Sequence, residues 1–125
     1  MDQIIISEDS SADVLASFAL CIHALTGGLP VTARSRKRSG IQVEEGEIKS
    51  KSYTGPLLEK ALAENKVIKG IPPAGIYKGI PVVVAPVSAN GNAIAAFGVV
   101  DTHGSMDIKA LMDQYSIIHK QVENR

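Results

Sequence analysis

Residues 81–101 read PVVVAPVSANGNAIAAFGVVD, and this stretch contains the strongest strand-pairing signal in the chain. Asn90-Gly91 lies between two runs of β-prone residues, and both residues tolerate the positive φ that a two-residue type I′ turn requires. The sequence therefore predicts a β-hairpin in which Ala89 lies opposite Asn92.

The turn also predicts the register of this hairpin, because regular antiparallel pairing follows from the first pair. The expected partners are Val87 with Ile94, Ala85 with Ala96, Val83 with Gly98, Val84 with Phe97 and Val82 with Val99. Both faces are then apolar, so we expect helices on one face and a further layer, a partner subunit or a ligand on the other. Pro86 has no N–H to donate, which predicts that the outer edge of its strand is locally unpaired.

The composition limits the class of protein. The chain has 125 residues, the size of one domain, and we expect a single domain over residues 1–125. Thirteen basic and thirteen acidic residues give a formal net charge of zero, which disfavours nucleic acid as a partner. The single cysteine, Cys21, fits a reducing compartment. The apolar runs are shorter than the about 20 residues of a membrane span, so we expect a soluble cytoplasmic protein with no membrane attachment.

A first helix is predicted after residues 10–13, which resemble a capping box. Its apolar positions recur at helical spacing and comprise Val14, Leu15, Phe18, Ile22 and Leu25. The helix should end at Gly27-Gly28. By helical phase, Cys21 lies near the buried face and His23 faces solvent.

The middle of the chain is predicted to contain a loop, a hairpin, a helix and a short strand. Residues 32–40 are predicted to form a loop, and residues 41–53 a second hairpin in which Ile41 and Val43 face the core. Gly55-Pro56 should open a second helix, with an apolar stripe of Leu57, Leu58, Ala61 and Leu62. A short strand is expected around Ile76 and Tyr77.

A last helix is predicted from Ser105 to the C-terminus, because apolar residues fall on one face over the final segment. They are Ile108, Leu111, Met112, Tyr115, Ile118 and Val122.

This order of elements predicts an α+β domain with a mainly antiparallel sheet of about five strands. Together with the strand patterns of residues 80–87 and 95–101, it resembles the GAF and PAS sensor domains. That resemblance implies N- and C-terminal helices on one face of the sheet and a small-molecule pocket on the other. Through residues 79–86 and 97–104, the chain also resembles the archaeal "domain of unknown function" family 2111, a resemblance that implies no activity.

Six residues are candidates for a ligand pocket. Ala85, Ala96 and Gly98 have small side chains, which would leave room above the sheet; the alternative is a helix packed closely there. Tyr53, Thr54 and Tyr77 border the crossing segments, where they could line a pocket or serve packing alone.

A second candidate site is an anion site formed by Arg34, Arg36 and Arg38, because guanidinium groups offer forked donors to phosphate and carboxylate. A solvated loop is the alternative. Asp101 and His103 are the candidates for an acid–base pair, with His23 and His119 far from them in the sequence, and no third ligand stands at a metal-like spacing. We therefore assign no catalytic residue, metal or cofactor.

Three hypotheses for function follow. The first is a small-molecule-binding regulatory module that acts as a dimer or with a separate partner, the second a purely structural homodimeric module, and the third an enzyme using Asp101 and His103. We predict a symmetric homodimer because Leu20 and Ile117 would point away from the core on the terminal helices. The apolar hairpin face is the rival dimer surface.

Overall fold

The computed structural model describes residues 2–102, which form two helices and six strands. In chain order these are α1 Ala12–Leu25, β1 Val31–Ser35, β2 Gly40–Glu44, β3 Glu47–Tyr53, α2 Pro56–Glu64, β4 Ile68–Gly70, β5 Val82–Ala89 and β6 Asn92–Val100. The predicted helix from Ser105 lies outside the described residues.

The six strands form one sheet in the order β3-β2-β1-β6-β5-β4, and all neighbours are antiparallel. The predicted α+β class is confirmed, whereas the expected number of about five strands is too low. β4 was not predicted, and neither was β1, which we expected to lie in the loop of residues 32–40. Its polar residues misled the prediction, because pairing with β2 on one side and β6 on the other buries Thr32 and Ser35.

The β5–β6 hairpin has the predicted turn but a different register. Asn90 and Gly91 have φ values of 54° and 81°, and Ala89 pairs with Asn92. A β-bulge at Ile94 then shifts β6 by one residue. The pairs beyond it are Val87 with Ala95, Pro86 with Ala96, Ala85 with Phe97, Val84 with Gly98, Val83 with Val99 and Val82 with Val100.

Arg36 supplies the physical reason for this bulge. Its backbone N–H donates to the carbonyl of Ile94 at 2.9 Å, and its Nε donates to the carbonyl of Ala93 at 2.7 Å. Both carbonyls belong to the bulged stretch, so a residue 57 positions away in the chain stabilises the irregularity. No local pattern in the hairpin sequence reveals such a partner.

The outer edge of β5 is unpaired at Pro86, as predicted, because β4 pairs only with Val82, Val83 and Val84. The flanking strand is nevertheless β4, not the strand expected around Ile76 and Tyr77. Residues 71–80 form turns instead, with Gly75 and Gly79 at φ 92° and 82°. A hydrogen bond of 3.1 Å from the N–H of Gly79 to the carbonyl of Pro72 closes this segment on itself.

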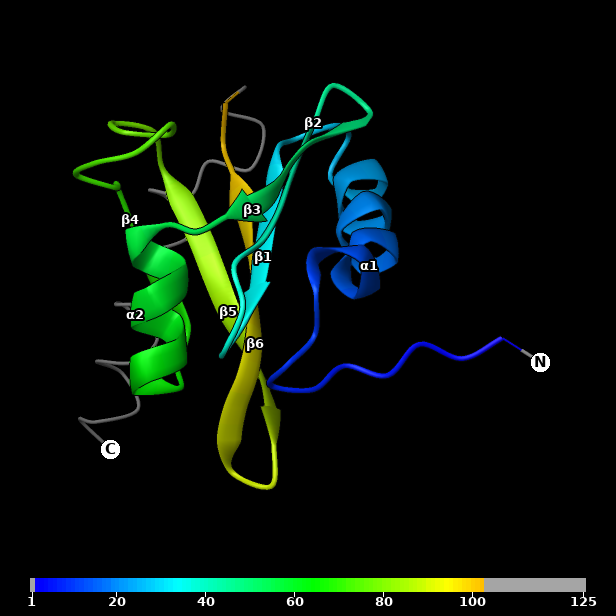
Figure 1. Cartoon of the computed structure of the whole chain (residues 1–125). Coiled ribbons are helices and arrows are strands. Elements are labelled where there is room, and N and C mark those ends of the chain that lie inside the picture. Colours follow the sequence, from blue (N-terminus) through cyan, green and yellow to red (C-terminus); the bar gives the residue numbers. More distant parts are fainter. Residues whose placement is uncertain (1, 103–125) are drawn as a thin grey trace, which may run out of the picture.

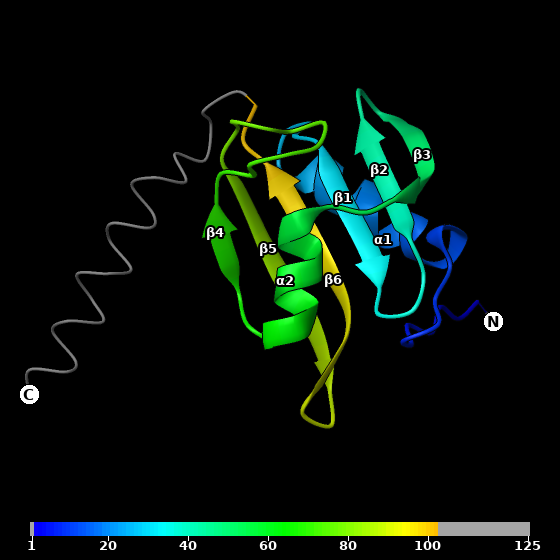
Figure 2. The same cartoon turned by 60° about the vertical axis from the view of Figure 1, so that its left-hand side comes forward.

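The two helices lie on opposite faces of the sheet (Figure 1). α1 packs on β1 and β2, whereas α2 packs on β5 and β6, so each helix covers one half of its face (Figure 2). The core is accordingly divided into two clusters. The α1 cluster contains Ile41 and Val43, which confirms their predicted direction, and the β2–β3 hairpin is confirmed with a turn at Glu45 and Gly46.

The second helix begins at Pro56, as predicted, and buries three of its four expected apolar positions, Leu58, Ala61 and Leu62. The fourth, Leu57, is partly buried against the same cluster.

The buried stripe of α1 differs from the prediction. Its buried residues are Ala12, Leu15, Ala19 and His23. Phe18 and Leu25 are 39% and 79% exposed, Cys21 is exposed rather than near the core, and Ser11 caps the helix without a side-chain hydrogen bond.

His23 explains why the stripe is rotated. Its Nδ1 donates to the carbonyl of Leu29 at 2.6 Å, and its Nε2 accepts from the N–H of Gly46 at 2.9 Å. Both ring nitrogens are thus satisfied, which allows the imidazole to be buried. The predicted exposure of His23 is wrong because these partners lie outside the helix.

Candidate functional site

A small cavity lies on the α2 face of the sheet, between the first turn of α2, the strands and residues 71–80. Its free space is about 20 Å³. That is on the order of the space needed by one water molecule, far below that of a metabolite. The lining residues are Thr32, Tyr53, Gly55, Pro56, Leu57, Leu58, Pro72, Ala74, Tyr77, Val82, Val84 and Val100.

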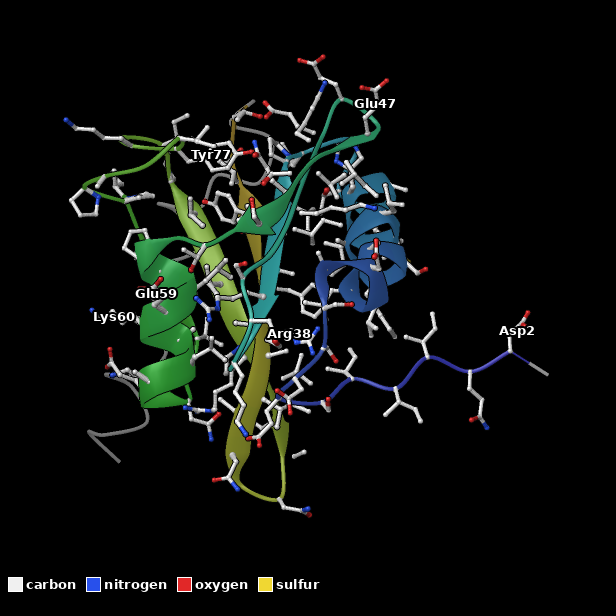
Figure 3. All side chains as sticks on the ribbon, viewed as in Figure 1. Asp2, Arg38, Glu47, Glu59, Lys60 and Tyr77 are labelled. Atoms are coloured by element: carbon white, nitrogen blue, oxygen red, sulfur yellow. The ribbon has the colours of Figure 1, made fainter. Side chains whose placement is uncertain are left out.

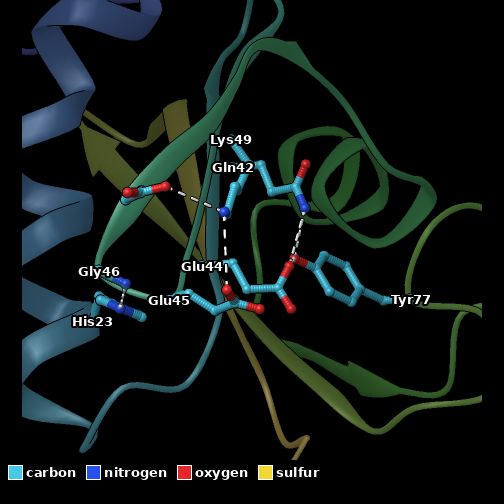
Figure 4. Close-up of polar contacts among 8 residues, drawn as sticks. His23, Gln42, Glu44, Glu45, Gly46, Lys49 and Tyr77 are labelled. Carbon is cyan, nitrogen blue, oxygen red and sulfur yellow. Dashed lines mark hydrogen bonds and ion pairs between the residues drawn. The ribbon is translucent and has the colours of Figure 1, made fainter.

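Tyr77 closes one side of this cavity and is held in place by two polar side chains. Its hydroxyl accepts from Nε2 of Gln42 at 3.0 Å and donates to the carboxylate of Glu44 at 3.2 Å (Figure 4). Burial raises the pKa of the Tyr77 hydroxyl well above its ordinary value. Both partners lie on β2, so Tyr77 fastens residues 71–80 to the sheet (Figure 3).

Tyr53 forms another part of the wall. Its ring lies 6.4 Å from that of Tyr77, and burial raises the pKa of its hydroxyl. A Cβ on Gly55 would come within 2.9 Å of the Tyr53 hydroxyl oxygen, which explains the glycine before Pro56. Within residues 2–102 the Tyr53 hydroxyl has no hydrogen-bond partner. It is therefore a polar group that the protein leaves unused beside an apolar cavity.

The six predicted ligand residues do not all meet at this cavity. Tyr53 and Tyr77 line it, whereas Thr54 lies beside it and bonds to Arg34 and Glu59, both at 2.7 Å.

The expected patch of Ala85, Ala96 and Gly98 does not exist as one surface. The bulge in β6 places Ala85 on the sheet face opposite the other two residues. The space above Gly98 is filled, because a Cβ there would lie 2.9 Å from both Thr32 Oγ1 and Val84 Cγ2. Gly98 therefore permits close packing of the neighbouring side chains and leaves no open volume on its face, whereas Ala85 lies exposed on the other face.

The three candidate anion-binding arginines point to different partners. Arg34 bonds to Thr54 and lies 3.6 Å from the Glu59 carboxylate. Arg36 donates to the carbonyls of Ala93 and Leu62, at 2.7 and 2.9 Å. Arg38 is exposed, and its guanidinium makes no contact of this kind within the described part of the chain (Figure 3).

The candidate acid–base pair is described only in part. Asp101 is 7% exposed, and its Oδ1 has no hydrogen-bond partner among the described residues. His103 lies outside the described residues. Over residues 2–102, no group of three or more His, Cys, Asp or Glu side chains is arranged to hold a metal ion. The helices of this region are also too short or too polar to cross a membrane.

The fold and the cavity define an α+β domain with a six-stranded antiparallel sheet and a tyrosine-lined candidate pocket. Residues 22–103 match the model of a family described as an uncharacterized protein conserved in archaea, domain of unknown function 2111. The chain belongs to this family, as the sequence predicted. Every residue that lines the cavity lies within the matched region.

A relative supports this assignment. The chain is 40% identical over 98 residues to an uncharacterized protein of Methanocaldococcus jannaschii, a match that covers 78% of this chain and 75% of the relative. No solved structure matches the chain.

Proposed function

We propose that this protein is a regulatory module that binds a small molecule in the tyrosine-lined cavity. The observation that carries this proposal is the Tyr53 hydroxyl, which is partly buried in an apolar wall and has no hydrogen-bond partner within residues 2–102. The hydroxyl is not enclosed, so water can reach it, and it can both donate and accept a hydrogen bond to a ligand that enters the apolar cavity beside it.

The lining of the cavity indicates the chemistry of the ligand. Its walls are mainly aliphatic and proline side chains, and the Tyr77 hydroxyl is already used by Gln42 and Glu44. Because burial raises its pKa, the Tyr53 hydroxyl stays neutral near pH 7 and can both donate and accept. We therefore expect a small, largely apolar molecule with a single hydrogen-bonding group near Tyr53.

A ligand of this kind must enlarge the cavity, and we expect residues 71–80 to be the wall that moves, with the bonds of Tyr77 to Gln42 and Glu44 as its attachment to the sheet. Their main-chain hydrogen bonds are largely internal to the segment, such as Lys78 to Gly75 at 3.2 Å. Ile71 and Ile76 in this wall are 60% and 65% exposed. Displacement of the wall on binding would change the apolar surface that the protein presents to a partner, which is how such a module would transmit a signal.

We further propose that the module acts as a homodimer through the outer surface of α1. Two apolar side chains there support this idea, since Leu20 is 36% exposed and Leu25 is 79% exposed. Sedimentation of the wild type should give a dimer at micromolar concentration. A Leu20→Glu, Leu25→Glu variant should be monomeric, whereas Lys60→Glu on α2 should not change the mass. A wild-type monomer would end this part of the proposal.

The binding hypothesis is tested by native mass spectrometry of protein purified from its own source, followed by thermal melting with small probes. Phenol, benzoate and indole are suitable probes because each combines an apolar ring with one hydrogen-bonding group. We expect a co-purifying small molecule, and a probe that raises the melting temperature of the wild type and of Arg38→Gln but has less effect on Tyr53→Phe. Ligand-free native protein with no response to any probe would contradict the proposal.

A further inference from the structure

Half of one sheet face is apolar and has no helix over it among the described elements. This open face consists of Val83, Ala85 and Val87 on β5, and of Phe97 and Val99 on β6. The register places them on one side, because Val83 pairs with Val99 and Ala85 with Phe97. It is the face opposite α2, beside the half that α1 covers (Figures 1 and 2).

The described contacts show how little of this open face is covered. α1 reaches it at Phe18, whose ring packs edge-on against Phe97 at 6.4 Å. Val83, Ala85 and Val87 belong to neither core cluster, and Ala85 is exposed. A contiguous apolar patch on the inner strands of a sheet normally has a partner layer.

The course of the chain indicates which segment covers it. At the end of β6, the N–H of Val100 donates to Pro30 at 3.0 Å, and that of Asp101 donates to Pro81 at 2.9 Å. The chain therefore leaves the sheet at the end of the open face where β5 begins. Residues 103–125 continue from that point.

The sequence of this segment matches the open face in polarity and length. Its six apolar positions from Ile108 to Val122 have helical spacing. At a rise of about 1.5 Å per residue, a helix between these two positions is about 21 Å long. β5 has 8 residues. At about 3.3 Å per residue, that strand is about 26 Å long, so one such helix covers most of it.

Asp101 is a second, independent observation at the same place. Its side chain is 7% exposed, and Oδ1 accepts no hydrogen bond from the described residues. A buried carboxylate oxygen without a donor is costly. Backbone N–H groups at the start of a helix favour carboxylates, and a helix that begins a few residues after Asp101 would offer such groups.

We propose that residues 103–125 dock on the open face of their own chain as a helix beside α1, with Asp101 accepting a hydrogen bond from the beginning of that segment. The occupant is the chain itself rather than a second copy. The proposal does not depend on the ligand cavity, which lies on the other face of the sheet.

Disulfide trapping in the full chain tests this arrangement, with Cys21→Ser as the background. At about 3.3 Å per residue, Ala85 lies about 10 Å along β5 from the start of the strand. At about 1.5 Å per residue, Met112 lies about 10 Å along the proposed helix from Ser105, so the two residues would lie at the same height. The pair Ala85→Cys with Met112→Cys should therefore form an intramolecular disulfide under mild oxidation. Ala85→Cys with Gln114→Cys, at a similar height but on the opposite side of the helix, is the matched control.

We expect the Met112 pair to cross-link within one chain at least tenfold faster than the Gln114 pair. Covalent dimers from the Met112 pair would assign the open face to a second copy and overturn the proposal. Equal or undetectable cross-linking of both pairs would overturn it as well.

Hydrogen exchange gives an independent readout that needs no cysteine. Amides of residues 106–122 should be protected in the wild type, and Val87→Asp should lower that protection at least tenfold. Ser52→Asp, on the exposed strand β3, should leave it unchanged. Asp101→Ala should lower protection first at the start of the segment. Absence of protection in the wild type would overturn the proposal.

Discussion

The two hairpins of this protein have the same kind of turn and different positions in the sheet. β2–β3 turns at Glu45 and Gly46, with φ 55° and 75°, and β5–β6 turns at Asn90 and Gly91, with φ 54° and 81°. β3 is polar and exposed at the sheet edge, whereas β5 and β6 are apolar on both faces and lie inside the sheet. The turn therefore determines that two strands pair, and the polarity of the strands determines where the pair lies.

Each hairpin is also fastened by one distant side chain. The buried imidazole of His23 binds the turn of β2–β3, and the guanidinium of Arg36 binds the bulge of β5–β6. The His23 imidazole is buried, and it stabilises the fold by bonding to two main-chain groups, the carbonyl of Leu29 and the N–H of Gly46. Arg36 is exposed and contributes through hydrogen bonds at the surface. This difference predicts unequal costs of removing the two side chains.

The largest effect is expected at the first residue of β2. A Cβ on Gly40 would overlap the backbone carbonyl of Ala33 on the neighbouring strand, and a backbone atom cannot move aside cheaply. Gly40→Ala should lower the free energy of unfolding by about 4 kcal/mol or more. Chemical denaturation measures this, with Gly46→Asn at the open turn as the control. A stable Gly40→Ala protein would show that β1 and β2 are not this close.

The next effect concerns the imidazole that holds the β2–β3 turn. His23→Phe keeps a ring in the core but leaves the carbonyl of Leu29 and the N–H of Gly46 without their partner. We expect a loss of about 1 to 3 kcal/mol, because the buried carbonyl of Leu29 is left unsatisfied, whereas the N–H of Gly46 lies at an exposed turn that water can reach. A melting temperature equal to that of the wild type would mean that water replaces both bonds.

In the β5–β6 hairpin, Gly98→Val tests how tightly the α2 face is packed. The added carbons would press on Thr32 Oγ1 and Val84 Cγ2, each of which lies 2.9 Å from the position that a Cβ on residue 98 would take. Overpacking of this kind costs about 1 to 3 kcal/mol. The control is Gly70→Val, because no atom lies within 4 Å of the position that a Cβ on residue 70 would take. Denaturant unfolding compares the free energies of unfolding of the two variants. Equal stability of the two variants would contradict the filled space above Gly98.

A smaller effect is expected from the guanidinium that supports the bulge. Arg36→Gln removes the bonds to Ala93 and Leu62 and should cost about 1 to 2 kcal/mol, as hydrogen bonds of this kind typically do. Arg38→Gln should cost nothing measurable. The anion hypothesis is therefore best tested at Arg38, where lost phosphate binding would not reflect lost stability. If Arg36→Gln and Arg38→Gln were equally stable, the bonds of Arg36 would not be what stabilises the bulge.

The smallest effect is a dependence on alkaline pH. Tyr53 ends β3, Tyr77 bonds to β2, and burial raises the pKa of both hydroxyls. A tyrosine in the unfolded chain has a pKa of about 10. The stability that these two hydroxyls contribute is therefore complete below that pH, and it is lost as the pH rises toward and through their pKa values in the folded protein. At about pH 11 the loss from Tyr77 should reach about 1 kcal/mol, because its pKa is raised furthest. Thermal melting from neutral pH to that pH should show a smaller decrease for Tyr77→Phe than for the wild type. An equal decrease in both would exclude Tyr77 as the source.

Local signals predicted part of this fold. The two-residue turn at Asn90-Gly91, the start of α2 at Pro56 and the alternation of Ile41 and Val43 depend on neighbouring residues, and the structure agrees with each. The family was also predicted from short strand segments.

The features that the sequence did not reveal depend on contacts between distant residues. β1 is a strand because β2 and β6 pair with it, and the bulge at Ile94 exists where Arg36 binds. His23 is buried because Leu29 and Gly46 satisfy it. At the site, Tyr53 and Tyr77 were identified from their position beside crossing segments, whereas the cavity is formed by α2 and residues 71–80, whose approach no periodicity indicates.

The strand order has a consequence for the speed of folding. β2–β3 and β5–β6 are joined by two-residue turns, and such hairpins form in about 1 to 10 μs. The seam between β1 and β6 joins Thr32 to Gly98 and closes a loop that contains both hairpins. Closing a loop of this length costs chain entropy before any seam contact repays it, so contacts of this kind slow folding. The hairpins should therefore form early, and pairing of β1 with β6 should limit the rate at which the sheet is completed.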